Sequence, residues 1–209
     1  MDYTALTTNI QDICETTFTA DVLVMFTQQS EQKIYNSVQI PALRKNVTGT
    51  ISGSNKYLTA PSDFIWAYSL AVISAGDVYT YLINKDVNFM REAYPNPSDK
   101  GVPKHYAYFD DDTFILGPTP ETSYSTELHY GYYPESIVTA GTTWLGENFD
   151  SALLNGALIE AIRFMKGEPD VVAMYEKLYL QSITLLKNLG DGKLREDAYR
   201  SGQVRTTVS

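Results

Sequence analysis

The sequence predicts an α+β protein: a small helical bundle with an inserted antiparallel β-rich module and an extended C-terminal tail. Apolar side chains recur at helical spacing near both ends of the chain, in residues 6–38 and 150–189. Between these segments, aromatic and β-branched residues alternate with polar ones, as in half-buried antiparallel strands. We therefore expect N-terminal helices in 1–45, a β-rich module with a short helix in 46–134, a C-terminal helical hairpin in 135–190 and the tail in 191–209.

Two helices are expected before the module. Residues 6–14 have the spacing of a short amphipathic helix. Thr19 is the expected N-cap of a longer helix. That helix should end near Ile40, because a residue that precedes a proline, here Pro41, is pushed out of the α region.

The first half of the module is expected to contain a weak strand and a hairpin. The weak strand covers residues 47–51. Strands at 66–72 and 78–83 flank the turn Ala75–Asp77, in which a glycine is followed by an aspartate. Asn84 is the expected cap of a short helix that runs to Tyr94 and stops before Pro95.

The clearest strand patterns lie between Pro103 and Pro134. Two turns divide them, the acidic run Asp110–Asp112 and the corner Pro118–Pro120, since aspartate and proline both favour turns. The alternating positions are His105, Ala107 and Phe109 against Tyr106 and Tyr108, and then Tyr124, Thr126, Leu128, Tyr130 and Tyr132 against Ser125, Glu127, His129 and Gly131. We expect these strands to form one small sheet.

The C-terminal segment is expected to form a helical pair. A loop over 134–146 leads to a helix that ends at Gly167. Pro169 suits the first turn of the last helix, which should end at Gly190. Because the link between the two helices is short, they should pack antiparallel.

Composition excludes several classes of protein. The formal charge of −9 argues against tight binding to nucleic acid, which needs lysine and arginine to displace counterions. One cysteine, Cys14, excludes an internal disulfide, and its apolar neighbours indicate a buried thiol. No apolar run has the length of a membrane span, and the first residues do not form a signal peptide, so no membrane partner is expected.

Candidate catalytic and binding residues are few. Asp110–Asp112 lacks the alternating oxygens and the glycine of a calcium loop, and a solvated hairpin tip is the favoured interpretation. His105 and His129 could be neighbours across strands, but no carboxylate or cysteine stands beside them at zinc-ligand spacing. No phosphate-binding loop or nucleophile elbow is present. We expect no catalytic residue, no metal and no cofactor.

An aromatic stripe has two interpretations. Its members are Tyr124, Tyr130, Tyr132 and Tyr133. Such a stripe could stack on sugars, or it could form the core and margin of a sheet.

Several motifs carry a resemblance to a known family. They are Phe64-Ile65, Leu82-Ile83-Asn84-Lys85-Asp86, Phe89-Met90-Arg91-Glu92-Ala93-Tyr94-Pro95, Gly101-Val102-Pro103-Lys104-His105-Tyr106, Leu116-Gly117-Pro118-Thr119-Pro120 and Leu128-His129-Tyr130-Gly131-Tyr132-Tyr133-Pro134. Their order resembles that of the head-to-tail adaptor, or connector, proteins of short-tailed phages, and is similar to tail-tube gatekeeper proteins. The likeness extends from the first helix to about Leu189.

The resemblance implies a structural virion protein of the phage neck, assembled in the host cytoplasm. Such adaptors form a ring, commonly of twelve copies, that joins the portal protein to a nozzle or tail-tube protein. During genome ejection, DNA passes through the ring without specific binding. Two alternatives stay open: a glycan- or receptor-binding tail component with a concave exposed aromatic patch, and a small hydrolase with an exposed carboxylate pair.

Two sets of residues are expected to make contacts. The tail has four basic and three acidic residues, a net charge of +1: Lys193, Arg195, Arg200 and Arg205 against Asp191, Glu196 and Asp197. It is expected to contact the portal or a neighbouring subunit through Arg195, Tyr199, Arg200 and Arg205, because arginine and tyrosine are enriched at interfaces. Tyr130, Tyr132 and Tyr133 are the expected interface aromatics of the sheet.

Overall fold

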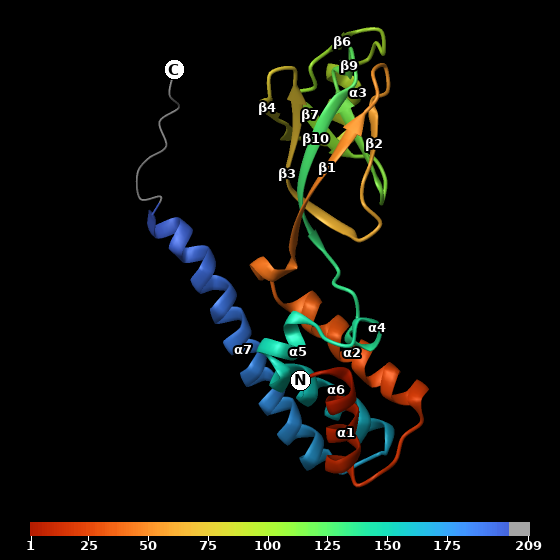
Figure 1. Cartoon of the computed structure of the whole chain (residues 1–209), viewed down its shortest axis with the longest axis vertical. Helices are drawn as coiled ribbons and strands as arrows, with labels where there is room; N and C mark the ends of the chain where they lie inside the picture. The colour runs from red at the N-terminus through yellow and green to blue at the C-terminus, as the bar shows by residue number, and fades with distance from the viewer. Residues whose placement is uncertain (201–209) are drawn as a thin grey trace. The chain divides into compact units, whose positions relative to one another are not determined.

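The computed structural model describes the backbone of residues 1–200 and the side chains of residues 1–190. The chain forms two compact units (Figure 1). A helical unit contains Met1–Ala42 and the chain from Pro134 onward, and a β unit contains Leu43–Tyr133. The predicted α+β class, with a β-rich segment inserted between helices, is confirmed.

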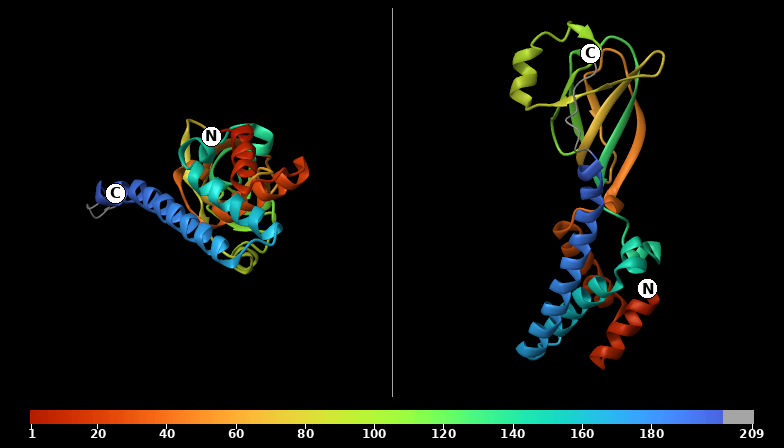
Figure 2. Two further views of the ribbon diagram at one scale, coloured as in Figure 1. Left: turned by 90° about the horizontal axis from the view of Figure 1, so that it is seen from below. Right: turned by 90° about the vertical axis from the view of Figure 1, so that its left-hand side faces the viewer.

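The helical unit is built around α6. Its helices are α1 (Tyr3–Cys14), α2 (Ala20–Ser37), α4 (Ile137–Ala140), α5 (Trp144–Asn148), α6 (Asp150–Phe164) and α7 (Pro169–Arg200). Helix α6 packs against α1, α2, α5 and α7, and Figure 2 shows it between α7 and the N-terminal helices. Buried side chains of this unit include Leu6, Ile10, Leu23, Phe26, Ile34, Leu153, Ala157, Leu158, Ile162, Ile183 and Leu186.

Three helix boundaries follow the sequence signals. Thr19 is the N-cap residue of α2, although its side chain makes no capping hydrogen bond. Val38, just after α2, has extended backbone dihedrals, as expected shortly before Pro41. Pro169 begins α7, where its missing N–H leaves no intrahelical bond unmade.

The predicted end of the last helix at Gly190 is wrong, because α7 continues through Gly190 to Arg200. A Cβ added at Gly190 would lie 2.8 Å from both the Gln39 carbonyl oxygen and the Ile40 Cγ2. This glycine therefore serves a close approach of α7 to the segment after α2, and it does not terminate the helix.

The predicted loop over 134–146 is also wrong, because it contains α4 and the first residues of α5. Each short helix begins with a side-chain cap: Ser136 Oγ accepts from the Val138 N–H, and Thr143 Oγ1 accepts from the Gly146 N–H. Capping by serine and threonine satisfies backbone donors that a single helical turn cannot satisfy itself. Apolar periodicity over so few residues is too brief to show in the sequence.

The β unit contains two four-stranded sheets and a small third one. The first sheet has the order β1 (Arg44–Ile51), β10 (Tyr124–Tyr132), β3 (Phe64–Ser74), β4 (Val78–Tyr81) and is antiparallel throughout. The second has the order β2 (Tyr57–Thr59), β8 (Thr113–Gly117), β7 (His105–Tyr108), β5 (Ile83–Asn84). The third pairs β6 (Lys100–Gly101) with β9 (Thr119–Pro120), and a 3₁₀ turn (Pro41–Leu43) precedes β1.

The two larger sheets share one core. Its buried members are Ile51, Ala60, Leu70, Val72, Leu82, Tyr106, Phe114, Leu116, Tyr124, Leu128 and Tyr130. Helix α3 (Val87–Ala93) lies over the second sheet, where Met90 packs with Ala107 and Ile115. Its N-cap is Asp86, whose carboxylate accepts from the Phe89 N–H at 2.7 Å, so the predicted cap at Asn84 is wrong.

The expected single sheet over 103–134 is corrected to two. Strands β7 and β8 form a hairpin in the second sheet, while β10 lies in the first sheet between β1 and β3. The corner at Pro118–Pro120 therefore carries the chain from one sheet to the other. His105 and His129 consequently belong to different sheets and are not cross-strand neighbours.

Candidate interaction surfaces

Helix α7 carries apolar side chains on more than one of its sides. Ile183 and Leu186 are buried. Other apolar side chains of the same helix are exposed: Val171 (38%), Met174 (50%), Leu178 (40%), Leu180 (61%), Leu185 (63%) and Leu189 (39%). Several of them recur at the spacing of helix–helix contacts. A surface helix of a monomer is normally apolar on one stripe, so this second apolar surface indicates a binding partner.

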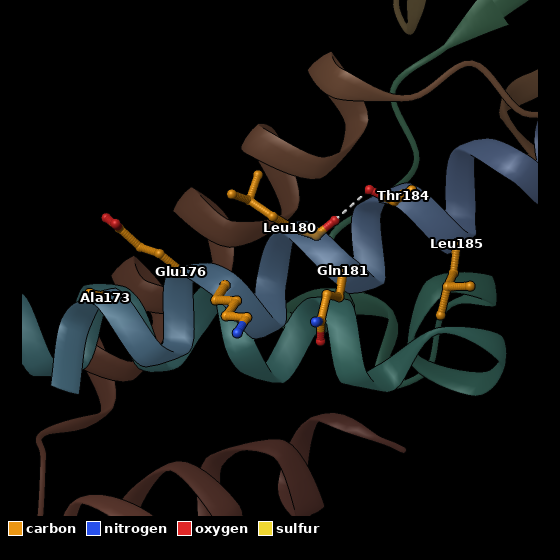
Figure 3. Close-up of a pocket in the computed structure, with 7 residues that line it drawn as sticks. Ala173, Glu176, Leu180, Gln181, Thr184 and Leu185 are labelled. Carbon is orange, nitrogen blue, oxygen red and sulfur yellow. Dashed lines mark hydrogen bonds between the residues drawn. The ribbon is translucent and has the colours of Figure 1, made fainter. Parts of the chain in front are cut away.

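An open pocket lies along this part of α7, and Figure 3 shows Leu180 and Leu185 on opposite sides of the helix. Seven residues of α7 line its volume of about 720 Å³: Ala173, Glu176, Lys177, Leu180, Gln181, Thr184 and Leu185. The Thr184 hydroxyl donates to the Leu180 carbonyl at 2.8 Å, so the backbone already binds it. Leucines flanked by an amide and by charged side chains suit contact with another protein.

Ion pairs hold α7 and α2 against α6. Arg163 of α6 donates to the Glu176 carboxylate of α7 at 2.6 Å. Lys33 of α2 forms an ion pair with Glu160 of α6. Helix α7 is thus held in the helical unit by the buried side chains of Ile183 and Leu186 and by the ion pair between Glu176 and Arg163.

The predicted interface aromatics have different surroundings. Tyr130 is only 3% exposed, and its hydroxyl donates to the Asp63 carboxylate at 2.8 Å. Burial, together with the bond to Asp63, raises the pKa of Tyr130 to about 12. Tyr132 is half-buried with the Lys45 ammonium 4.0 Å from its ring centroid, and Tyr133 is 39% exposed. Tyr130 is therefore packed within its own chain, whereas Tyr132 and Tyr133 present surface.

Asp63 joins three elements of the β unit. Lys45 of β1 donates to its second oxygen at 2.6 Å, opposite the bond from Tyr130 of β10. Burial alone would raise the pKa of Asp63, but the hydrogen bonds from Lys45 and Tyr130 and the lysine charge outweigh it and lower the pKa. This network ties the turn before β3 to both neighbouring strands.

Two exposed tyrosines were not predicted as contact residues. Tyr79 and Tyr81 of β4 are 45% and 62% exposed, and their rings stack with centroids 6.3 Å apart. Val78 of the same strand is 58% exposed. The signal available in the sequence was a strand from Val78 to Ile83 without a single charged residue.

The aromatic stripe considered for sugar stacking is divided by the fold. Tyr124 and Tyr130 are 6% and 3% exposed and belong to the shared core. Tyr132 is half-buried and Tyr133 is 39% exposed. The four rings therefore do not form a continuous exposed platform.

The candidate chemical groups are engaged in structural contacts. His105 Nδ1 is 2.6 Å from the Tyr94 hydroxyl, and its pKa is lowered by burial and then by two nearby lysines. His129 packs edge-on against Tyr68. Within residues 1–190 no group of three or more His, Cys, Asp or Glu side chains could hold a metal ion. Cys14 is only partly buried, against the expectation of a buried thiol.

Within residues 1–190, two carboxyl groups have shifted pKa values, and each is bound by donors of its own unit. Glu31 lies in the helical unit, where it accepts from the Ile137 N–H at 2.8 Å and from the Ser136 hydroxyl at 2.6 Å. Burial raises the pKa of Glu31 in spite of these two bonds. Asp63 lies in the β unit. Glu31 joins α2 to the start of α4, and Asp63 joins the turn before β3 to β1 and β10, so both carboxyl groups have a structural role.

The predicted tail contacts lie outside the described side chains. The backbone of Arg195, Tyr199 and Arg200 belongs to α7, and Arg205 follows the described backbone. In the part of the chain with a described fold, no helix has the length and apolar character needed to cross a membrane.

The described residues form exposed apolar and aromatic surfaces and hydrogen-bonded carboxyl groups that hold elements together. These features are typical of a structural protein that binds other proteins. Comparison with known families identifies it more closely: residues 1–207 match the family described as SU10 adaptor protein. The chain belongs to the SU10 adaptor protein family, a family of structural phage adaptors, and the resemblance to phage adaptors is confirmed. No curated protein sequence matches it.

Proposed function

We propose that this protein is the head-to-tail adaptor of a phage virion, present as a ring that joins the portal to the tail protein and leaves a channel for DNA. The observation that carries the proposal is the exposed apolar surface of α7 in a member of an adaptor family. A monomer in solution gains nothing from exposing Leu180 and Leu185. In a ring, the same surface is covered in every copy, and a ring of twelve is the expected size.

The test replaces leucine by serine at positions 180 and 185. Burying a leucine stabilises a contact by about 1.5–3 kcal/mol, and these side chains are already partly covered, so about 1–2 kcal/mol is lost at each. Together the two changes weaken the contact by roughly a hundredfold. The control variant carries Ile13→Ser and Val47→Ser, which are also exposed apolar positions but lie on other elements.

The readout is particle mass, measured with and without portal protein. We expect the unchanged chain to be monomeric or weakly associated alone and to form a closed ring on the portal. The control variant should do the same, and the α7 variant should not. A stable ring without portal would refute the templating part of the proposal, and ring formation by the α7 variant would refute the role of α7.

The tail is proposed to contribute a second attachment, to the portal or to a neighbouring subunit. Its arginines and Tyr199 suit contact with an acidic protein surface, and repetition around a ring multiplies weak contacts. Deleting residues 191–209 should abolish attachment to the portal. It removes the helical residues 191–200 of α7, while the other helices and the sheets should stay folded. Attachment equal to that of the full chain would move the site to α6 and α7.

The channel is proposed not to bind DNA. A net charge of −9 disfavours phosphate contacts, so we expect no saturable binding of duplex DNA at physiological salt. Tight binding with a steep salt dependence would refute this. The glycan-binding alternative has less support, because Tyr124 and Tyr130 of its aromatic platform are buried.

A further inference from the structure

Strand β4 forms one edge of the first sheet of the β unit. It pairs with β3 on one side, in the register Ser74↔Val78 to Ala71↔Tyr81. The Leu82 N–H donates to the Leu70 carbonyl at 2.8 Å, just beyond this ladder. Because hydrogen-bonded pairs alternate in an antiparallel ladder, the peptide groups of Val78 and Thr80 face β3, and those of Tyr79 and Tyr81 face outward.

Apart from its short length of four residues, this edge lacks the features that normally prevent strand addition. Exposed edges are usually protected by lysine, proline, a bulge or a covering element. In β4 the four residues are Val-Tyr-Thr-Tyr, without charge or proline. Val78, Tyr79 and Tyr81 are 58%, 45% and 62% exposed, so apolar side chains on both faces of the strand reach solvent. Within the described residues, no further strand pairs with β4.

We propose that the β4 edge of one copy binds residues 203–208 of a second copy as an added strand. The inference rests on the proposal that the tail contacts a neighbouring subunit, and it names the surface. Strand addition obtains affinity from main-chain hydrogen bonds and specificity from alternate side chains. The outward peptide groups of Tyr79 and Tyr81 supply the main-chain hydrogen bonds. The stacked rings of the same two residues supply the side-chain contacts that give specificity.

The segment 203–208 has the composition of such a strand. It reads Gln-Val-Arg-Thr-Thr-Val, in which β-branched residues predominate and proline and acidic side chains are absent. Val204, Thr206 and Val208 share one face of an extended chain. Aromatic and β-branched side chains on adjacent strands form favourable pairs, so this face suits the Tyr79 and Tyr81 rings.

The length and charge of segment 203–208 also fit the β4 edge. The segment is long enough to span β4, which has four residues. Its one charged side chain is Arg205, and the exposed residue that precedes β4 is Asp77, so charge favours the pairing.

The acceptor in the experiment is the full chain with Thr206→Pro and Thr207→Pro, labelled with ¹⁵N. Two adjacent prolines remove the N–H groups on both edges of its own segment. The donor is an unlabelled full chain. A matched donor carries Thr206→Ala and Thr207→Ala, which keep both N–H groups, and a blocked donor carries the two prolines.

We expect the unlabelled natural chain to shift the Tyr79 and Tyr81 amide signals of the acceptor and to slow their hydrogen exchange. The alanine donor should do the same within a few-fold, and the blocked donor should bind at least roughly tenfold more weakly, the effect of losing about two net backbone hydrogen bonds. The ring contact of α7 is tested separately by particle mass with portal protein, so failure of the strand-addition proposal is distinguishable from failure of the ring proposal.

Three results would overturn the inference. One is the absence of any change at Tyr79 and Tyr81 with the natural donor. Another is an equal change with the blocked donor, which would assign the edge to another strand of the second copy. The third is concentration-independent protection of both amides in the natural chain alone, which would show that the segment binds its own copy.

Discussion

Replacing Gly156 by alanine tests the closest approach between helices in the helical unit. Gly156 lies in α6, and a Cβ built on it would stand 2.1 Å from Ser30 Oγ of α2. The same Cβ would be 3.1 Å from the Ser30 Cβ and 3.2 Å from a ring carbon of Tyr179 in α7. Three helices therefore converge on a position that has no room for a methyl group.

The magnitude follows from the contacts of Ser30. Its hydroxyl is buried and donates to the Leu153 carbonyl at 3.0 Å. Moving it away forfeits that bond and leaves a buried polar group unpaired, which costs about 1–3 kcal/mol. Overpacking against the remaining neighbours costs about 1–3 kcal/mol. The higher helix propensity of alanine returns about 1 kcal/mol, so we expect a net loss of about 1–5 kcal/mol.

The assay is urea unfolding followed by far-UV circular dichroism at a helix-sensitive wavelength. The Gly156→Ala variant should unfold at lower urea with little change in slope. In a Ser30→Ala background the 2.1 Å conflict is gone, so the same glycine substitution should cost about 1 kcal/mol less. If Gly156→Ala stabilises the protein by about 1 kcal/mol, as propensity alone predicts, the close approach is refuted.

Two further substitutions test the buried hydrogen bonds. Because burial raises the pKa of Glu31, the folded chain keeps its proton to a higher pH than the unfolded chain does, and stability falls as pH rises above the ordinary value of 4.5. Glu31→Gln should flatten that fall in urea midpoints measured across pH, and parallel curves for the two proteins would contradict this. Tyr130→Phe removes the donor to Asp63 and should cost about 1.5–3 kcal/mol, whereas Tyr132→Phe, which keeps the ring over which Lys45 lies, should cost little. Equal urea midpoints for the two phenylalanine variants would show that the bond to Asp63 contributes nothing.

Local signals predicted the elements, because each depends on neighbouring residues. Thr19 and Pro169 mark helix starts through backbone geometry that is set within one turn. The alternation correctly predicted that Tyr124, Thr126, Leu128 and Tyr130 share one face, which is buried, since successive strand residues point to opposite sides. The alternation fails at the end of the strand, where Gly131 is buried and Tyr132 is half-buried, because the pairing with β3 is irregular there.

Tertiary packing was not predictable in the same way. Gly190 has the appearance of a helix stop, and only its approach to Gln39 shows why a helix passes through it. The separation of β7 from β10 depends on long-range pairing that alternation does not encode. The exposed residues of α7 carry the same apolar pattern as buried ones, so periodicity alone could not separate core from contact surface.

The pairing of β1 with β10 has a consequence for how the chain folds. Arg44 lies opposite Gly131, so the segments by which the chain enters and leaves the β unit are adjacent. Helices α2 and α6 are separated in the chain by the whole of that unit, and bringing them together costs the entropy of closing a long loop. Once the β unit has folded, its adjacent ends shorten the effective loop between α2 and α6. Most of the entropy of closing that loop has then already been lost. We therefore expect formation of the β unit to accelerate assembly of the helices that precede and follow it in the sequence.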